Sequence, residues 1–261
     1  MTRRKALLTV GVAAALSLGG AIAAPFASAA ENGASVGARQ SGVERWLDLW
    51  SSRRGSNNSG DNNTEAAVGD CADVEFVFAR GTGDFPRPLG ILGVPLGREL
   101  TNKLPGKTVN AFGIDYAADF AQSSDGPGAT EMTRHIVEVA GECANTKFVI
   151  GGYSQGASVT DIAVNATGAR VLGRGETIPE ELAPRIAAVV VFGNPLSGFA
   201  GGPLENASDL YGAKTKSFCG NSDTVCGGAR NGNITGGHLS YTSNGAIAQA
   251  ATFAAGKVNG S

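Results

Sequence analysis

Histidine is scarce in this chain, with only His135 and His238 among 261 residues. The four cysteines form no Cys-x-x-Cys motif. Together these absences disfavour a zinc site, which is usually built from closely spaced cysteine and histidine ligands. The scarcity of histidine also limits the choice of a general base to two residues, because histidine is the most common general base near neutral pH.

Excess positive charge is also absent. The chain carries 21 Lys and Arg against 23 Asp and Glu, so its formal net charge is −2. Proteins that bind nucleic acid usually have a basic surface, and this composition predicts no nucleic-acid partner. With 42% apolar and 17% charged residues, the chain suits one medium-sized globular domain with a substantial core.

The long apolar run that the chain does have lies near its N-terminus. Three cations at positions 3 to 5 precede a stretch rich in Ala, Leu, Val and Gly, and Ala27-Ser28-Ala29 fits a cleavage site. We interpret residues 1–30 as a signal peptide, with a retained anchor as the alternative. Its removal would leave 18 Lys and Arg against 23 Asp and Glu, a formal charge of −5. We therefore expect a secreted, extracellular protein, either free or associated with the cell envelope.

Residues 31–70 differ in composition from the rest of the chain. Ser, Asn, Gly and Asp dominate positions 51–64, which is typical of a flexible linker. Just before it, Trp46 and Trp50, the only tryptophans, fall on one helical face. We interpret this stretch as a short helix packed on the domain, and the alternative is contact with a lipid or envelope surface. The folded domain is predicted to span residues 71–257.

All four cysteines, Cys71, Cys143, Cys219 and Cys226, follow the predicted signal peptide. An even number in an exported chain indicates two disulfides, for which three connectivities exist. Cys219 and Cys226 are close in sequence and are expected to pair. Cys71 would then pair with Cys143, closing a long loop and stabilising the fold by about 4 kcal/mol in the chain-entropy model. Metal binding is the alternative.

Apolar runs and helical periodicity alternate along the domain. Strands are expected at 74–79, 108–114, 148–152 and 185–192, with a weaker, edge-like strand at 214–218. Helices are expected at 93–103, 131–143, 154–166 and 240–257. The run at 185–192 is almost continuously apolar, which indicates burial on both sheet faces. This alternation predicts an α/β fold with a parallel sheet covered by helices on both sides.

The sequence Gly152-Tyr153-Ser154-Gln155-Gly156 lies between an expected strand and an expected helix. A glycine-flanked serine in this setting is typical of a nucleophile elbow, in which a tight turn exposes the serine. The flanking glycines allow two backbones to approach closely. The helix that follows directs its N-terminus at the site where negative charge develops during acyl transfer. A simple Gly-Ser turn is the alternative.

A nucleophilic serine needs a base and a carboxylate that orients the base. His238 is the only histidine after Ser154, and His135 lies on an expected helix as an ordinary surface or half-buried residue. In folds with a nucleophile elbow, the carboxylate lies between the serine and the histidine along the chain. Asp223 is preferred, because a disulfide between Cys219 and Cys226 would hold its loop. The other candidates are Asp161, Glu176, Glu180, Glu181, Glu205 and Asp209, of which Asp161 is too close to the serine in sequence.

An oxyanion hole is expected beside the serine. One donor should be the backbone N–H of Gln155, the residue after the nucleophile. The second should come from the loop after the first strand, where Thr82 offers a backbone N–H and a hydroxyl. Spacing alone does not distinguish Thr82 from Gly81 or Gly83.

These motifs, taken in order, resemble the cutinase family, and in detail its exported actinobacterial esterases. The resemblance covers residues 71–257. It implies a small, lidless α/β-hydrolase, a three-layer α/β/α sandwich around a five-stranded parallel sheet. It implies Ser154, Asp223 and His238 as the triad, Thr82 and Gln155 as oxyanion donors, and Ile234 as a substrate-binding residue. The motifs are Ala79-Arg80-Gly81-Thr82, the pentapeptide around Ser154, Phe192-Gly193-Asn194-Pro195, the Cys219 to Cys226 loop and His238-Leu239-Ser240-Tyr241.

The resulting expectation is a secreted serine esterase, a carboxylic ester hydrolase of cutinase type. The substrates would be cutin-like polyesters or short- and medium-chain acyl esters, and neither a metal nor an organic cofactor is required. We expect a monomer that can touch a lipid or polymer surface. The alternatives are a lipase or phospholipase that acts on lipid surfaces, and a catalytically inactive surface-binding protein on the same fold.

Overall fold

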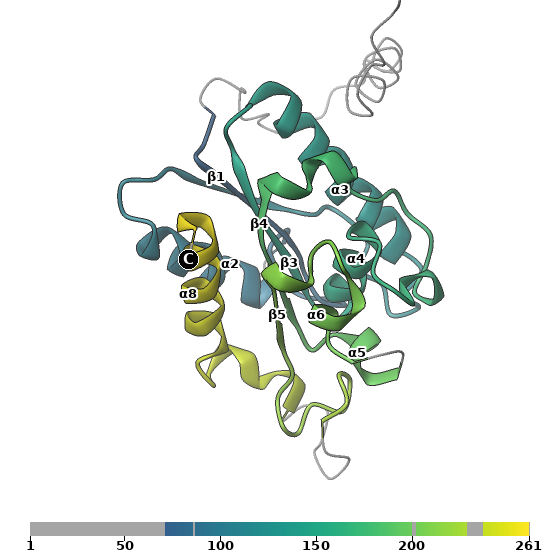
Figure 1. The fold of residues 1–261 in the computed structure, drawn as a ribbon. Coiled ribbons are helices and arrows are strands. Elements are labelled where there is room, and N and C mark those ends of the chain that lie inside the picture. Colours follow the sequence, from purple (N-terminus) through teal and green to yellow (C-terminus); the bar gives the residue numbers. More distant parts are fainter. Residues whose placement is uncertain (1–70, 86, 200–201, 229–236, 261) are drawn as a thin grey trace, which may run out of the picture. The chain divides into compact units, whose positions relative to one another are not determined.

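Five parallel strands form the centre of the domain. A computed structural model describes residues 71–85, 87–199, 202–228 and 237–260. The strands lie in the order β2-β1-β3-β4-β5, and every neighbouring pair is parallel (Figure 1). The predicted five-stranded parallel sheet is confirmed. The strands are β1 (Val74–Ala79), β2 (Val109–Gly113), β3 (Lys147–Tyr153), β4 (Ile186–Phe192) and β5 (Thr215–Phe218).

The central strands are buried on both faces, which explains their apolar sequences. All six residues of β1 are buried, and so are all but the first residue of β3. Gly151 of β3 pairs with Val190 of β4, and a Cβ on Gly151 would lie 2.0 Å from the Val190 carbonyl oxygen. The outer strands β2 and β5 are partly exposed, as expected for sheet edges.

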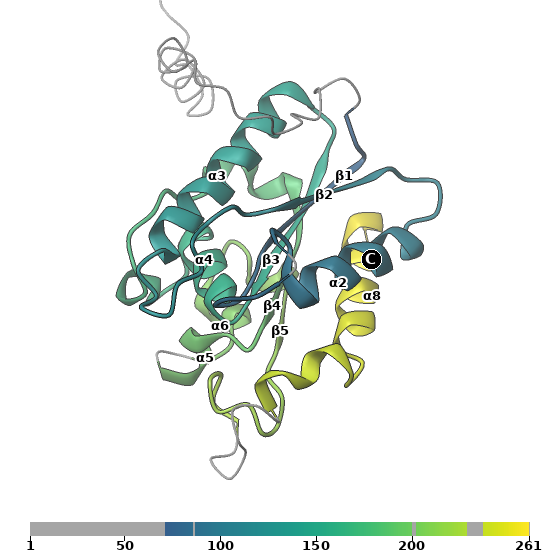
Figure 2. The ribbon, with the colours of Figure 1, turned by 180° about the vertical axis from the view of Figure 1, so that it is seen from behind.

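Helices cover both faces of the sheet (Figures 1 and 2). On one face α2 (Gly90–Lys103) packs against α8 (Ala246–Asn259), and together they bury one apolar cluster against the sheet. On the other face α3 (Asp125–Glu142) packs against α4 (Gln155–Ala163) over a second cluster. The three-layer arrangement expected from the sequence is therefore present.

Several helix boundaries differ from the sequence expectation. Helix α3 begins at Asp125, six residues before the expected start at 131, although its first turn contains Gly126, Pro127 and Gly128. Proline is tolerated there because its missing N–H would have no partner in the helix. The glycines are needed for close packing, since a Cβ on Gly126 would lie 2.2 Å from the Arg174 carbonyl oxygen.

The C-terminal helix also starts later than expected. A 3-10 turn at Ser240–Thr242 precedes α8, which begins at Ala246 after Gly245 adopts φ +83°. Two short helices, α5 (Pro195–Phe199) and α6 (Leu204–Ala207), follow β4 and were not predicted. Further 3-10 turns span Ala169–Val171, Glu180–Arg185 and Gly212–Lys214.

Both predicted disulfides are present. Cys71, just before β1, is bonded to Cys143 at the end of α3, with the two Cα atoms 5.5 Å apart. Cys219 and Cys226 enclose a short loop after β5, with their Cα atoms 5.7 Å apart. The first bond joins the sheet to the helical layer, and the second constrains only the loop that contains Asp223.

The predicted signal peptide, linker and tryptophan segment at residues 1–70 lie outside the described residues, and so does Ile234. Within the described ranges no helix is long and apolar enough to cross a membrane. The same part of the chain contains no cluster of three or more side chains suited to holding a metal ion.

Candidate active site

Ser154 occupies a sharp turn between β3 and α4. Its backbone has φ +55° and ψ −117°, a conformation that costs free energy for a residue with a Cβ and is found mainly at functional sites. The Ser154 N–H donates to the carbonyl of Phe192 at 2.9 Å, which joins the turn to the end of β4. The serine side chain is half-buried at the carboxyl end of the sheet.

The glycines around Ser154 are required by close backbone contacts. A Cβ on Gly152 would lie 2.0 Å from the carbonyl oxygen of Gly156. A Cβ on Gly156 would lie 1.9 Å from the carbonyl oxygen of Ala79, at the end of β1. Helix α4 can therefore start directly against the sheet, which places its N-terminus beside the serine.

His238 and Asp223 form a buried hydrogen-bonded pair. His238 Nδ1 lies 2.8 Å from Asp223 Oδ2, and the Asp223 side chain is fully buried. The same oxygen accepts the Tyr241 hydroxyl at 2.5 Å, and Oδ1 accepts the Val225 N–H at 2.9 Å. Burial acts to raise the pKa of Asp223, but the hydrogen bonds from His238 and Tyr241 outweigh it, and the net shift is downward. The carboxylate therefore stays ionised at neutral pH.

The loop around Asp223 is tightly closed. The Asp223 N–H donates to the carbonyl of Gly220 at 2.9 Å, and the Asp223 carbonyl accepts the N–H of Gly228 at 2.7 Å. The bond between Cys219 and Cys226 encloses this turn. The carboxylate is thus held by both covalent and hydrogen bonds.

Removing that disulfide is expected to lower kcat even in molecules that remain folded. In a Cys219→Ser/Cys226→Ser variant the short loop gains freedom, worth about 2.5 kcal/mol of unfolding free energy in the chain-entropy model. We expect kcat to fall about tenfold or more, because imidazole orientation depends on the carboxylate. Steady-state kinetics and thermal unfolding of the same samples test this expectation.

The other disulfide supplies a matched control. A Cys71→Ser/Cys143→Ser variant opens a longer loop, with a cost of about 4 kcal/mol, yet it should keep kcat in molecules that remain folded. Equal kcat values in the two double variants would contradict a local role for the bond at Asp223.

Two further residues position the imidazole. The Tyr153 hydroxyl donates to the His238 carbonyl at 2.9 Å, and the two rings lie 4.9 Å apart between centroids. Gly193 adopts φ +54°, and a Cβ there would lie 2.5 Å from His238 Cε1 and 2.9 Å from Asp223 Oδ2. The motifs that carry the family resemblance include Tyr241 and Gly193, but sequence reasoning assigned neither of them a role.

The three predicted triad residues gather at the carboxyl ends of β3, β4 and β5. Ser154 directly follows Tyr153, whose hydroxyl bonds to the His238 carbonyl. The Ser154 N–H bonds to Phe192, and the next residue, Gly193, lies close to the His238 ring. The hydrogen bonds of the described residues include none between Ser154 Oγ and His238 Nε2. Catalytic hydrogen bonds of this kind commonly form only when substrate binds.

Thr82 and Gln155, the predicted oxyanion donors, are in direct contact. The Thr82 hydroxyl donates to Gln155 Oε1 at 2.9 Å. Gln155 is the first residue of α4, so its backbone N–H has no acceptor within the helix. In the described part of the chain the backbone N–H of Thr82 has no acceptor either. Both N–H groups are thus free to bind an anion beside the serine.

Arg80 fixes the turn that presents Thr82. Its guanidinium is completely buried and donates to the carbonyls of Ile114 at 3.2 Å and Tyr116 at 2.5 Å. The Tyr116 hydroxyl donates back to the Arg80 carbonyl at 2.5 Å. These reciprocal bonds join the end of β1 to the loop after β2 and hold the neighbouring Gly81 and Thr82 in place.

The remaining histidine and the elbow-helix aspartate lie elsewhere. His135 Nε2 is 2.7 Å from Glu75 Oε1, near the amino end of β1, and its ring stacks on Phe112. Asp161, on α4, is fully buried and accepts a hydrogen bond from Asn194 Nδ2 at 3.0 Å. Burial raises the pKa of Asp161 well above its ordinary value, and the hydrogen bond from Asn194 acts against this increase.

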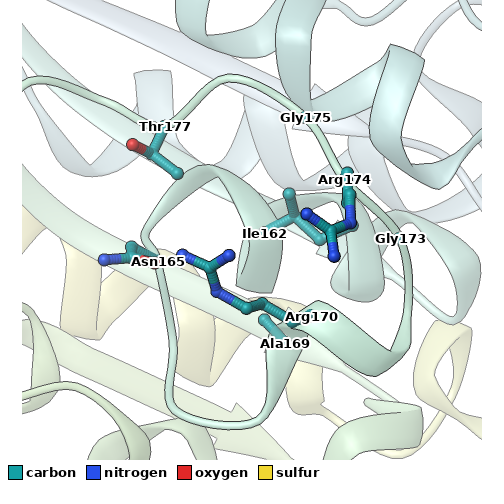
Figure 3. A pocket seen from close by; sticks show the side chains of 8 residues that line it. All are labelled: Ile162, Asn165, Ala169, Arg170, Gly173, Arg174, Gly175 and Thr177. Carbon is teal, nitrogen blue, oxygen red and sulfur yellow. The ribbon is translucent and has the colours of Figure 1, made fainter. Parts of the chain in front are cut away.

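One surface pocket lies away from these residues, at the C-terminal end of α4. It holds about 200 Å³, and Figure 3 shows Arg170 and Arg174 lining it around Ile162. It contains none of the predicted site residues, and Ser154 lies at the opposite end of the same helix. The lining residues are Ile162, Asn165, Ala169, Arg170, Gly173, Arg174, Gly175 and Thr177.

Comparison with known proteins gives consistent results. A cutinase of Kineococcus radiotolerans is 54% identical over 189 residues, which cover 72% of this chain and 62% of that protein, less than two thirds of its length. The phospholipase Culp4 of Mycobacterium tuberculosis is 40% identical over 193 residues, covering 72% of this chain and 80% of that protein.

A solved structure, Trichoderma reesei cutinase in complex with a phosphonate inhibitor, aligns with a TM-score of 0.55 at 28% identity. The alignment covers 83% of this chain and 87% of that one. The model of the family described as Cutinase matches residues 70–258, which include every predicted site residue. From this match and from the relative with 54% identity, we conclude that the chain belongs to the cutinase family.

Proposed function

We propose that this protein is a secreted serine esterase that hydrolyses carboxylic esters through an acyl-enzyme. The observation that carries the proposal is the hydrogen-bonded pair of His238 and Asp223 at the sheet end where Ser154 occupies a strained turn. Two free backbone N–H groups, at Thr82 and Gln155, complete the set of groups that ester hydrolysis needs.

In the first half-reaction Ser154 Oγ attacks the ester carbonyl and its proton passes to His238 Nε2. Nδ1–H faces the Asp223 carboxylate, which leaves the Nε2 lone pair free to act as the base. The carbonyl π electrons move onto oxygen, and the oxyanion accepts hydrogen bonds from Thr82 and Gln155. When the tetrahedral intermediate collapses, the C–O bond to the alcohol breaks and His238 returns its proton to the departing oxygen.

The second half-reaction uses water in place of serine. His238 takes a proton from water as the water oxygen attacks the acyl carbon, and the same donors bind the new oxyanion. Collapse releases the acid and returns the proton to Ser154 Oγ. The steps balance without a metal or an organic cofactor.

Apolar side chains around the site support an insoluble ester as the substrate. The exposed fractions are 89% for Phe120, 64% for Phe85 and 51% for Leu239. Phe85 follows the Thr82 loop, Leu239 adjoins His238, and the Phe120 ring lies 3.6 Å from the position of a Cβ on Gly83. We propose that this rim touches a polyester or lipid surface and that a monomer suffices for it. Cutin-like polyesters and short- or medium-chain acyl esters are the proposed substrates.

A lipase or phospholipase is the second candidate. It is favoured by the 40% identity to a phospholipase, Culp4, and by the same apolar rim.

Two disulfides are consistent with the proposed secretion, because such bonds persist in oxidising compartments.

Hydrolysis of p-nitrophenyl esters from acetate to palmitate tests the proposal. We expect the highest kcat/KM at short or medium acyl length, because the family resemblance implies a lidless, open site. An optimum at palmitate, together with release of fatty acid from phosphatidylcholine vesicles, would favour the lipase or phospholipase. No hydrolysis of any ester by oxidised protein, and no labelling by a serine-reactive phosphonate, would favour the inactive binding protein.

A further inference from the structure

The side chain of Gln155 is completely buried beside the proposed oxyanion hole, and its amide is fully hydrogen-bonded. Gln155 Nε2 donates to Asp125 Oδ1 at 2.7 Å and to Ser124 Oγ at 3.3 Å. Gln155 Oε1 accepts the Thr82 hydroxyl at 2.9 Å. The amide therefore connects the first turn of α3 to the loop after β1.

The direction of each hydrogen bond from Asp125 through Gln155 to Thr82 follows from Asp125. An ionised carboxylate only accepts hydrogen bonds, so the NH₂ end of Gln155 must face it. Oε1 then faces Thr82 and, as a pure acceptor, takes the hydroxyl hydrogen. The Thr82 oxygen in turn accepts Gln122 Nε2 at 3.0 Å. The hydroxyl hydrogen of Thr82 is thus directed at Gln155.

The charge of Asp125 supports this assignment. Burial raises the pKa of its carboxyl to about 6, the bond from Gln155 acts against burial, and the nearby Asp119 carboxylate adds to the increase. At pH 8 Asp125 is ionised. Its place in the first turn of α3 favours the negative charge further, because the helix dipole is positive at that end.

We propose that Asp125 is a positioning residue of the oxyanion hole. It orients the Gln155 amide and, through Gln155 Oε1, anchors the Thr82 side chain and the loop that carries the Thr82 N–H. The two backbone N–H groups of Thr82 and Gln155 are thereby held in place for the oxyanion. This inference rests on the proposed esterase function and deepens it, since neither the sequence motifs nor the triad geometry assigns Asp125 a role.

Two substitutions of Asp125 separate the hydrogen bond from the charge. Asp125→Ala removes the acceptor, so the Gln155 amide loses its fixed orientation, and we expect kcat to fall about 10- to 100-fold with KM changed less than about twofold. Asp125→Asn keeps an oxygen for Gln155 Nε2 and should retain kcat within about threefold of wild type. The assay is p-nitrophenyl butyrate hydrolysis at pH 8. Wild-type kcat in Asp125→Ala, or equal losses in the two variants, would overturn the inference.

Glu131→Ala is the matched control. Glu131 is a second carboxylate of α3 whose pKa burial raises, and it accepts the Asp115 N–H at 3.0 Å with no contact to Gln155. Its removal should leave kcat and KM unchanged. A kcat loss in Glu131→Ala as large as in Asp125→Ala would show a general effect of the helix and would overturn the inference.

A third variant keeps the inference testable if Asp125→Ala does not fold. Gln155→Leu retains the backbone N–H but has no amide to orient, and it should lose kcat to the same extent as Asp125→Ala. Unchanged kcat in folded Gln155→Leu would overturn the inference. Wild type and Ser154→Ala are assayed together: no serine-dependent hydrolysis by wild type means that the proposed function fails. If hydrolysis depends on Ser154 and both Asp125→Ala and Gln155→Leu keep wild-type kcat, only the inference fails.

Discussion

Ser154→Ala is expected to abolish ester hydrolysis while the fold stays intact. Without Oγ no acyl-enzyme forms, and loss of a triad serine typically lowers kcat by about 10⁵- to 10⁶-fold. Alanine keeps the Cβ, so the turn at φ +55° carries the same backbone cost and the melting temperature should not move. Burst kinetics with a p-nitrophenyl ester and thermal unfolding measure the two effects.

Ser158 offers a matched control on the same helix. Its hydroxyl is buried and, among the described residues, has no hydrogen-bond partner, so Ser158→Ala removes a hydroxyl group without breaking a bond. It should keep full activity. If Ser154→Ala retained wild-type turnover while Ser158→Ala lost it, the nucleophile would have been assigned to the wrong serine.

Asp223→Asn is expected to lower kcat by about 10⁴-fold. The carboxylate accepts hydrogen bonds from His238, Tyr241 and Val225, and an amide group of the same shape cannot accept all of them with both ends. The imidazole then adopts the wrong tautomer or loses its orientation. The neutral amide also no longer stabilises the positive charge that the imidazole acquires when it takes the serine proton. Steady-state kinetics from pH 6 to 9 measure the loss, which should persist at every pH.

Asp161→Asn is the control for this effect. Asp161 is also completely buried, but its pKa lies well above the ordinary value and it bonds to Asn194, with no contact to the histidine. An amide of the same shape still offers an oxygen to Asn194 Nδ2 and leaves the histidine untouched, so kcat should be retained. Full activity in Asp223→Asn would require that another group orients His238.

The strands were predictable because burial on both sheet faces requires an apolar residue at nearly every position. The run from Ile186 to Phe192 is apolar at every position, and β4 occupies the predicted place within one residue. The start of α3 was predicted six residues too late, because Gly126 and Gly128 normally weaken a helix. The value of Gly126 depends on the loop around Arg174, 48 residues further along the chain, and that of Gly128 on Val159 and Tyr116. Periodicity contains no information about these contacts.

The candidate site likewise contains residues that the sequence could identify and residues that only the structure revealed. Ser154 has a local motif, and scarcity of histidine leaves His238 as the base, so both could be named without coordinates. The choice of Asp223 followed from the two cysteines around it. Tyr241, Gly193 and Asp125 act through contacts with residues 18 to 45 positions away along the chain, and they could be recognised only when those residues were brought together.

The sequence by itself determined the order of the five strands and of the four long helices, the two disulfides and the identity of the predicted nucleophile, base and carboxylate. Each of these depends on local pattern or on the small number of suitable residues. Only the tertiary structure decided how the groups are oriented: which atom of Asp223 faces the imidazole, why Gly193 admits no side chain, and which way the Gln155 amide points. Orientation depends on hydrogen-bond directions and on distances between distant segments, and those are set when the sheet and its helices pack together.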